Sequence, residues 1–268
     1  YATTTGVSVG ELFMAGIGAG LVYGLATIVY IFIYSKRHSL PKDAKASMGE
    51  ILIATRDVAW SLMIPVIILG GIYLGVMTPT EAAGVSAVYA IFVGMFVYKE
   101  LSFKKLLEVS RDSAVTCAQV LVLVAAAQAF GWFLTVARVP QTISTALLEN
   151  INSAWLFLVL INVILIIVGM FMEGIAAIII LGPLFYPIAV DLGIDPVHLG
   201  VIMVANLAIG NFTPPFGLNL FVATGITGMK MAKLVPAVMV YVVVNIIALL
   251  IITYIPEVSM FIPNLAYK

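Results

Sequence analysis

Long apolar runs separated by short polar segments are the feature that most restricts how this chain can fold. Ile175–Leu181 is continuously apolar and Ile247–Ile255 is apolar apart from Thr253, and a transmembrane helix needs roughly 20 largely apolar residues to cross about 30 Å of hydrocarbon. With 63% apolar side chains, 10% charged side chains and a mean hydropathy of +1.16, the chain cannot cover a soluble surface. Continuous runs, as opposed to alternating ones, exclude a transmembrane barrel. The sequence therefore predicts an all-α, polytopic membrane protein.

The apolar runs and the polar breaks between them predict a set of membrane segments. These are 12–34, 60–77, 82–98 and 112–137, a pair of arms over 154–190, an interrupted segment over 197–228, and a last span at 234–255. Each arm of 154–190 has about 16 residues, or roughly 24 Å at 1.5 Å per residue, which is short for a full crossing. This length favours a re-entrant hairpin, with two full crossings at 154–172 and 174–190 as the alternative.

The basic residues fix the sides of these segments. Eleven of the thirteen lie in three clusters: Lys36, Arg37, Lys42, Lys45 and Arg56; Lys99, Lys104, Lys105 and Arg111; and Lys230 with Lys233. All three clusters fall on one face if 154–190 enters and leaves on the same side, and the positive-inside rule makes that face cytoplasmic. The amphipathic stretch Leu101–Asp112 is expected to lie along this interface in contact with membrane lipid, with a solvated loop helix as the alternative.

Side chains and motifs that would indicate an enzyme are sparse. Cys117 is the only cysteine, which excludes a cysteine metal cluster and favours inert packing. His38 and His198 have no partner spacing for zinc, and no serine lies in a nucleophile elbow. There is no P-loop for ATP, and a formal net charge of zero gives no indication of a nucleic-acid partner. The chain is not expected to be an enzyme.

Helix-breaking residues interrupt the apolar pattern most clearly over Asn206–Asn219, which reads NLAIGNFTPPFGLN. Pro214 and Pro215 cannot continue a helix, while Gly210 and Gly217 permit backbone angles that other residues resist. Irregular backbone at membrane depth is tolerated where protein, water or ligand satisfies the freed polar groups. The sequence therefore favours a binding site here over a simple proline kink.

The chemistry of such a break suits two kinds of ligand. Carbonyl groups near 208–210, left unpaired at the end of the first half-helix, suit a cation, and N–H groups near Gly217 suit a carboxylate. Thr213 adds a hydroxyl oxygen. Three amide side chains lie in the same apolar setting: Asn206, Asn211 and Asn219.

A second interruption, GMFMEG at Gly169–Gly174, lies in the middle of the two arms. Carbonyl groups released at a hairpin tip are oxygen ligands of the kind that hard cations take. Glu173 has two interpretations: it faces protein, water or an ion, or it simply solvates at the tip. A third interruption, at Gly70–Gly84, is expected to be structural, with Thr78 or Thr80 capping a helix that begins at about Glu81.

Four motifs, in order along the chain, resemble the large membrane subunit of tripartite ATP-independent periplasmic (TRAP) transporters. They are TPTEAAG at Thr78–Gly84, GMFMEGIAAIIILGPLFYPIA at Gly169–Ala189, GIDPVHLGVI at Gly193–Ile202 and IGNFTPPFGLNLFVA at Ile209–Ala223. The resemblance implies an elevator-type transporter with two inverted repeats in the bacterial inner membrane. It also implies a sodium gradient as the driving force, a periplasmic substrate-binding protein and a small membrane (Q) subunit as partners.

The resemblance also implies site residues and a division of the chain. One Na⁺ would be bound by Gly169, Gly210, Thr213 and Phe216, mostly through main-chain oxygen, and Glu173 departs from the family pattern and is not counted. Asn206, Asn211 and Gly217 would face a small organic acid of the C4-dicarboxylate or sialic acid class. Residues 1–59 would be the last span of the first repeat plus a cytoplasmic linker, 60–111 scaffold helices with the interfacial arm, and 112–268 the second-repeat transport region, comprising hairpin 154–190, broken helix 197–228 and final span 234–255.

The first-repeat hairpin is absent from this sequence, and the chain is expected to be the later part of a longer protein. Two other functions remain open. One is a stand-alone sodium-coupled dicarboxylate carrier of the same broad architecture, which works without a binding protein. The other is a non-transporting scaffold subunit of a membrane complex, although such a subunit has no need of two facing helix interruptions.

Overall fold

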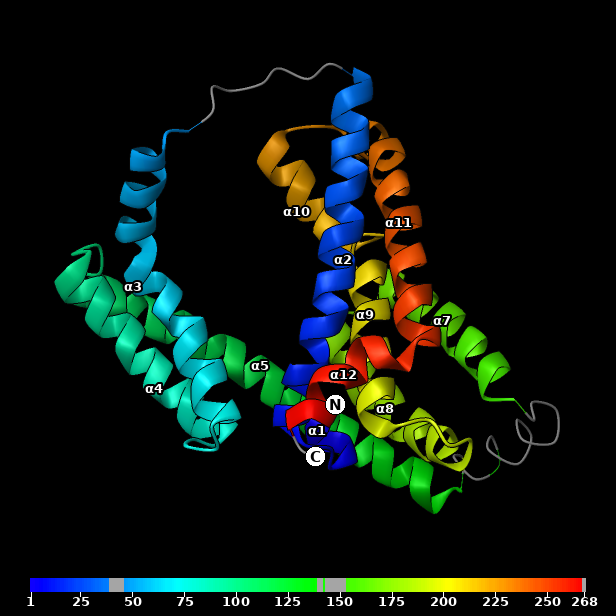
Figure 1. The fold of residues 1–268 in the computed structure, drawn as a ribbon. Coiled ribbons are helices and arrows are strands. Elements are labelled where there is room, and N and C mark those ends of the chain that lie inside the picture. Colours follow the sequence, from blue (N-terminus) through cyan, green and yellow to red (C-terminus); the bar gives the residue numbers. More distant parts are fainter. Residues whose placement is uncertain (39–45, 139–141, 143–152, 267–268) are drawn as a thin grey trace. The chain divides into compact units, whose positions relative to one another are not determined.

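A computed structural model describes residues 1–38, 46–138, 142 and 153–266, and within these residues the regular structure is helical, as the sequence predicts (Figure 1). The helices are α1 (Ala2–Thr5), α2 (Val9–His38), α3 (Met48–Tyr73), α4 (Pro79–Phe92), the π-helical turn η1 (Val93–Val97), α5 (Phe103–Val136), α7 (Ala154–Phe171), α8 (Gly174–Asp191), α9 (Pro196–Gly210), α10 (Leu218–Thr227), α11 (Met231–Tyr254) and α12 (Pro256–Ala266). Seven helices in the described part are long and apolar enough to cross a membrane. The protein is therefore a multi-pass membrane protein.

The chain divides into two compact units, one of residues 1–38 with 122–268 and one of residues 39–121. In the second unit, α3 packs against α4, and the Tyr98 hydroxyl donates to the Asp57 carbonyl oxygen (2.8 Å). The Thr78 hydroxyl accepts from the Glu81 N–H (3.3 Å), and the Glu81 carboxylate accepts from the Thr78 N–H (2.8 Å). This capping box, with Pro79 as the first helical residue, confirms the structural cap predicted at the third interruption.

The predicted interfacial arm is not a separate helix. One continuous helix, α5, covers both Leu101–Asp112 from Phe103 onward and the span predicted at 112–137. No glycine or proline occurs between residues 103 and 130, so nothing in the local sequence interrupts the helix. Polarity changes near Asp112, where the predicted span begins, but a change of polarity does not end a helix in the absence of a helix-breaking residue.

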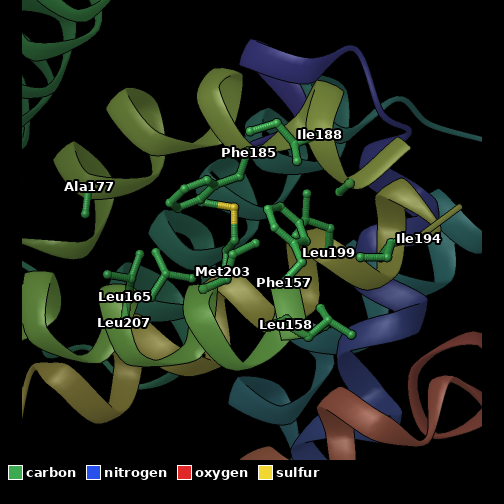
Figure 2. Packing of buried hydrophobic residues seen from close by; sticks show 13 residues of the cluster. Phe157, Leu158, Leu165, Ala177, Phe185, Ile188, Ile194, Leu199, Met203 and Leu207 are labelled. Carbon is green, nitrogen blue, oxygen red and sulfur yellow. The ribbon is translucent and has the colours of Figure 1, made fainter. Parts of the chain in front are cut away.

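In the first unit, α9 is the central helix and contacts α7, α8, α2, α11 and α12 (Figure 1). Four of its buried side chains, Leu199, Ile202, Met203 and Leu207, form one apolar cluster with side chains of α7 and α8 (Figure 2). Phe157 of α7 and Phe185 of α8 meet edge to face with ring centroids 6.5 Å apart, and Met203 of α9 lies beside them. The core of this unit therefore holds the hairpin arms on the first half of the interrupted segment.

The end of the chain contains a helix that the sequence analysis did not predict. The last predicted span, 234–255, corresponds to α11, and Pro256 then begins the short helix α12. Proline is tolerated in the first turn of a helix, so it marks a new start here as well as the end of the span. α12 packs on α2, where a Cβ atom at Gly18 would collide with the Val258 carbonyl oxygen.

Candidate functional site

The two arms are joined by a connection of only two residues, Met172 and Glu173, both with extended backbone. The Met172 N–H closes the last turn of α7 on the Val168 carbonyl oxygen (2.9 Å). The Glu173 side chain is exposed and accepts a hydrogen bond from the Ala176 N–H (3.3 Å), so it caps α8. This geometry favours the solvated interpretation of Glu173 over contact with a buried ion.

Behind this tip, the backbones of α7 and α9 touch at two buried glycines, Gly169 and Gly210. A Cβ atom at Gly210 would lie 2.5 Å from the Gly169 Cα and 2.6 Å from its carbonyl carbon. A Cβ atom at Gly169 would lie 3.0 Å from the Gly210 Cα. Gly210 is helical and has no positive φ. Glycine is therefore required at position 210 by the close approach of two backbones. It is not required by unusual backbone angles, as the sequence had led us to expect.

The interruption itself covers residues 211–217, between α9 and α10, as predicted. The last carbonyl groups of α9 are less exposed than expected, because tight turns return N–H groups to them. The N–H groups of Asn211, Phe212 and Thr213 donate to the carbonyl oxygens of Leu207, Ile209 and Gly210 at 3.0, 3.1 and 3.0 Å. The expectation of unpaired carbonyl groups at 208–210 is therefore wrong for Ile209 and Gly210. The Gly210 carbonyl oxygen keeps a second lone pair, whereas the Ile209 oxygen also accepts a bond from the Thr213 hydroxyl.

Thr213 is the buried hydroxyl of the interruption, with 4% of its surface exposed. Its Oγ1 donates to the Ile209 carbonyl oxygen at 2.6 Å. Since this bond uses the hydroxyl proton, the remaining lone pairs of Oγ1 can act only as acceptors or cation ligands. The geometry therefore leaves Thr213 chemically suited to a cation.

The start of α10 is tied to the hairpin tip. Gly217 has a φ of +39°, and its N–H donates to the Met170 carbonyl oxygen at 3.3 Å. The Asn219 N–H donates to the Asn211 carbonyl oxygen at 2.9 Å. The N–H groups of Gly217 and Asn219, which lie where the sequence predicted donors to a carboxylate, are thus already hydrogen-bonded within the protein. The Phe216 ring, half exposed, lies 5.4 Å from that of Phe171 between centroids and adds a second link to the tip.

The two asparagines of the predicted substrate site lie in different surroundings. Asn206 is fully buried on the α7 side, where its Nδ2 donates to the Asn162 Oδ1 (2.7 Å) and to the Ile202 carbonyl oxygen (2.8 Å). Asn211 lies by the start of α8, with its Nδ2 3.8 Å from the place a Cβ atom at Gly174 would take. The Oδ1 atoms of Asn206 and Asn211 are both buried without a hydrogen-bond partner.

The structure therefore brings most predicted site residues to one junction between the hairpin tip and the break. These are Gly169, Gly210, Asn211, Thr213, Phe216 and Gly217. Asn206 lies one turn before Gly210 and faces α7, which favours a packing role over the substrate contact predicted from the sequence. Asn162 was not among the predicted site residues, although its amide is the hydrogen-bonding side chain within the apolar run of α7.

No group of three or more His, Cys, Asp or Glu side chains able to hold a metal occurs in the part of the chain that the structure describes. The oxygen atoms of the junction are main-chain carbonyls, the Thr213 hydroxyl and the Asn211 amide oxygen. Rings of such neutral oxygens replace the hydration shell of alkali cations in channels. The residues present therefore fit a monovalent cation better than a transition metal, which prefers imidazole or thiolate.

Comparisons with known proteins agree with this architecture. Residues 1–258 match the family model of the tripartite ATP-independent periplasmic transporter, DctM component. A C4-dicarboxylate TRAP transporter large permease protein of Pseudomonas aeruginosa is 44% identical over 98% of this chain and 62% of its own length. An isethionate TRAP transporter permease of Oleidesulfovibrio alaskensis is 44% identical over 97% of this chain and 41% of its own. A sialic acid TRAP transporter large permease of Vibrio cholerae is 34% identical over 99% and 62%.

Proposed function

We propose that this chain, which belongs to the DctM-component family of tripartite ATP-independent periplasmic transporters, carries one Na⁺ site of a sodium-coupled importer in the bacterial inner membrane. The chain spans about three fifths of the length of the Pseudomonas aeruginosa relative. The activity, substrates and partners of the whole protein are therefore part of this proposal. The relatives are transporter permeases, which favours transport over enzymatic chemistry.

One observation carries the proposal: two membrane segments touch backbone to backbone at Gly169 and Gly210, next to a buried threonine hydroxyl. Main-chain oxygens of Gly169, Gly210 and Phe216, together with the Thr213 Oγ1, would hold the ion. A sodium ion placed here would bind the tip and the break simultaneously. Its binding would favour a closed junction, and this differential affinity is what couples an ion gradient to a conformational change.

The substrate proposed is a small organic acid. Relatives are named for C4-dicarboxylate, isethionate and sialic acid, and each of these compounds carries an acidic group. Asn211 is the side chain best placed to contact such a substrate, because it lies at the junction and its Nδ2 can donate to an acidic oxygen. The predicted contact of Gly217 would require its N–H to leave the Met170 carbonyl oxygen and donate to the substrate, and the predicted substrate contact of Asn206 stays a prediction.

The proposed partners are a small membrane (Q) subunit and a periplasmic substrate-binding protein, with the transport unit moving as an elevator against a scaffold. The test is uptake of labelled organic acids into proteoliposomes that hold the full-length membrane subunits, with and without a sodium gradient and the cognate periplasmic protein. Uptake that needs both supports the proposal. Uptake that needs sodium alone favours a stand-alone carrier, and absence of uptake under every gradient favours a scaffold subunit.

A further inference from the structure

A chain of hydrogen-bonded polar side chains runs through the apolar core of the first unit. The Asn206 Nδ2 on α9 donates to the Asn162 Oδ1 on α7 at 2.7 Å, and the Asn162 Nδ2 donates to the Thr253 Oγ1 on α11 at 3.2 Å. Asn206 and Thr253 are fully buried, and Asn162 is 5% exposed. Hydrogen bonds between side chains therefore link three helices that are distant in sequence.

This chain lies on the same helix faces as the glycine contact. Asn162 and Gly169 are seven residues apart on α7, which is about two turns and returns to one face. Asn206 and Gly210 are four residues apart on α9, which is about one turn on one face. Since Asn162 meets Asn206 and Gly169 meets Gly210, the two helices run in the same direction and touch at both levels.

The hydrogen bond fixes the axial register of this pair. If α7 slid along α9 by one residue or one turn, the Asn162–Asn206 bond would break and leave both amides unpaired in an apolar core, at a cost that apolar neighbours do not have. A single buried asparagine pair sets register in the same way in coiled coils, where it lowers stability. The unpartnered Oδ1 of Asn206 is a sign of that same cost here.

We propose that Asn206, held by Asn162 and Thr253, is a positioning residue that fixes the register of α7 on α9 and thereby the approach of Gly169 to Gly210. This inference rests on the proposed sodium site. These three hydrogen-bonded side chains do not contact the ion. Their hydrogen bonds hold α7, α9 and α11 together as one rigid unit, so that the two halves of the site keep a fixed position relative to one another.

The experiment measures sodium-dependent uptake by the full-length transporter in proteoliposomes. Asn206→Ala and Asn162→Ala should each raise the sodium concentration for half-maximal uptake by about threefold or more, the factor that a membrane hydrogen bond of average strength supplies. The substrate KM at saturating sodium should change much less in Asn162→Ala, because Asn162 is not among the predicted substrate contacts. Asn245→Ala is the matched control, because the Asn245 amide donates to the Tyr241 carbonyl oxygen of its own helix (2.8 Å). A merely structural role would lower the maximal rate and leave the sodium dependence unchanged, and that result would overturn the proposal.

Thr253 supplies a milder test that keeps the fold. Thr253→Val removes the hydroxyl at nearly constant shape and should shift the sodium dependence, whereas Thr253→Ser keeps the hydroxyl and should restore it. Equal sodium dependence in both variants would contradict the proposal.

Failure of the proposed function is distinguishable from failure of this inference. If the parent transporter shows no sodium dependence, the proposed function fails and the register role is judged by thermal unfolding. A double-mutant cycle of Asn162→Ala and Asn206→Ala then decides the matter. A double variant that melts no lower than the worse single variant supports the shared bond, and additive losses overturn it.

Discussion

Two interruptions with similar residues differ in where their polar groups are bonded. The turn at 74–78 and the break at 211–217 both combine a glycine at positive φ with a Thr-Pro pair. In the first, Thr78 and Glu81 satisfy one another within four residues. In the second, the Gly217 N–H donates to the Met170 carbonyl oxygen of α7, and Gly210 contacts Gly169 of the same helix.

The difference shows that helix-breaking residues alone do not identify a site. A turn that satisfies its own polar groups is a connection, whereas a break that also bonds to and packs against another helix forms a junction with that helix. Substitutions in the break should therefore change transport and its ion dependence. Substitutions in the turn should change only stability.

The largest effect is expected for Gly210→Val. Its Cβ would lie 2.5 Å from the Gly169 Cα, and backbone cannot move aside as a flexible side chain can. The α7–α9 contact should open, with a destabilisation of roughly 2 kcal/mol or more and loss of uptake in proteoliposomes. Gly84→Val in α4 is the control, because Gly84 is exposed and a Cβ there meets nothing within 4 Å. Uptake by Gly210→Val equal to that of the parent would refute the junction.

Gly217→Ala should have the next largest effect. Alanine at a φ of +39° is strained, and its Cβ would lie 2.9 Å from the Thr213 carbonyl oxygen. Gly75→Ala separates these two causes, because Gly75 has a φ of +67° with open space around it. We expect Gly75→Ala to cost about 1 kcal/mol of unfolding free energy and to leave uptake per folded protein unchanged. Gly217→Ala should cost more and reduce uptake, and equal effects of the two would contradict the comparison.

Thr213→Ala should act mainly on sodium. Removal of the hydroxyl takes away one ion ligand, so the sodium concentration for half-maximal uptake should rise about tenfold, the equivalent of one hydrogen bond to a charged group. Thr213→Ser should retain near-parental sodium dependence. Thr227→Ala is the control, because its hydroxyl makes a similar bond to the Ala223 carbonyl oxygen, at 2.7 Å, on an exposed part of α10. Unchanged sodium activation in Thr213→Ala would count against the site.

The sequence predicted most of the helices because apolar length is a local property, and it located the break because Pro214 and Pro215 act locally. It could not explain why position 210 needs glycine, because the neighbour that excludes a side chain there, Gly169, is brought close only by folding. The same holds for Asn206, whose partner Asn162 lies on another helix. The continuity of α5 was misjudged because polarity at Leu101–Asp112 was given more weight than the absence of helix breakers. Long-range contacts, not local patterns, separate the junction from the turn.

The smallest effect is expected for Thr78→Ala. The Thr78 hydroxyl accepts one N–H of the first turn of α4 at 3.3 Å, and loss of such a cap costs about 1 kcal/mol. Thr78→Ser should keep the cap and the stability. Thermal unfolding in detergent measures the loss, and uptake normalised to folded protein should match the parent at every sodium concentration. A shift in the sodium dependence of Thr78→Ala would mean that the turn also belongs to a junction, because a self-contained cap has no route to the ion.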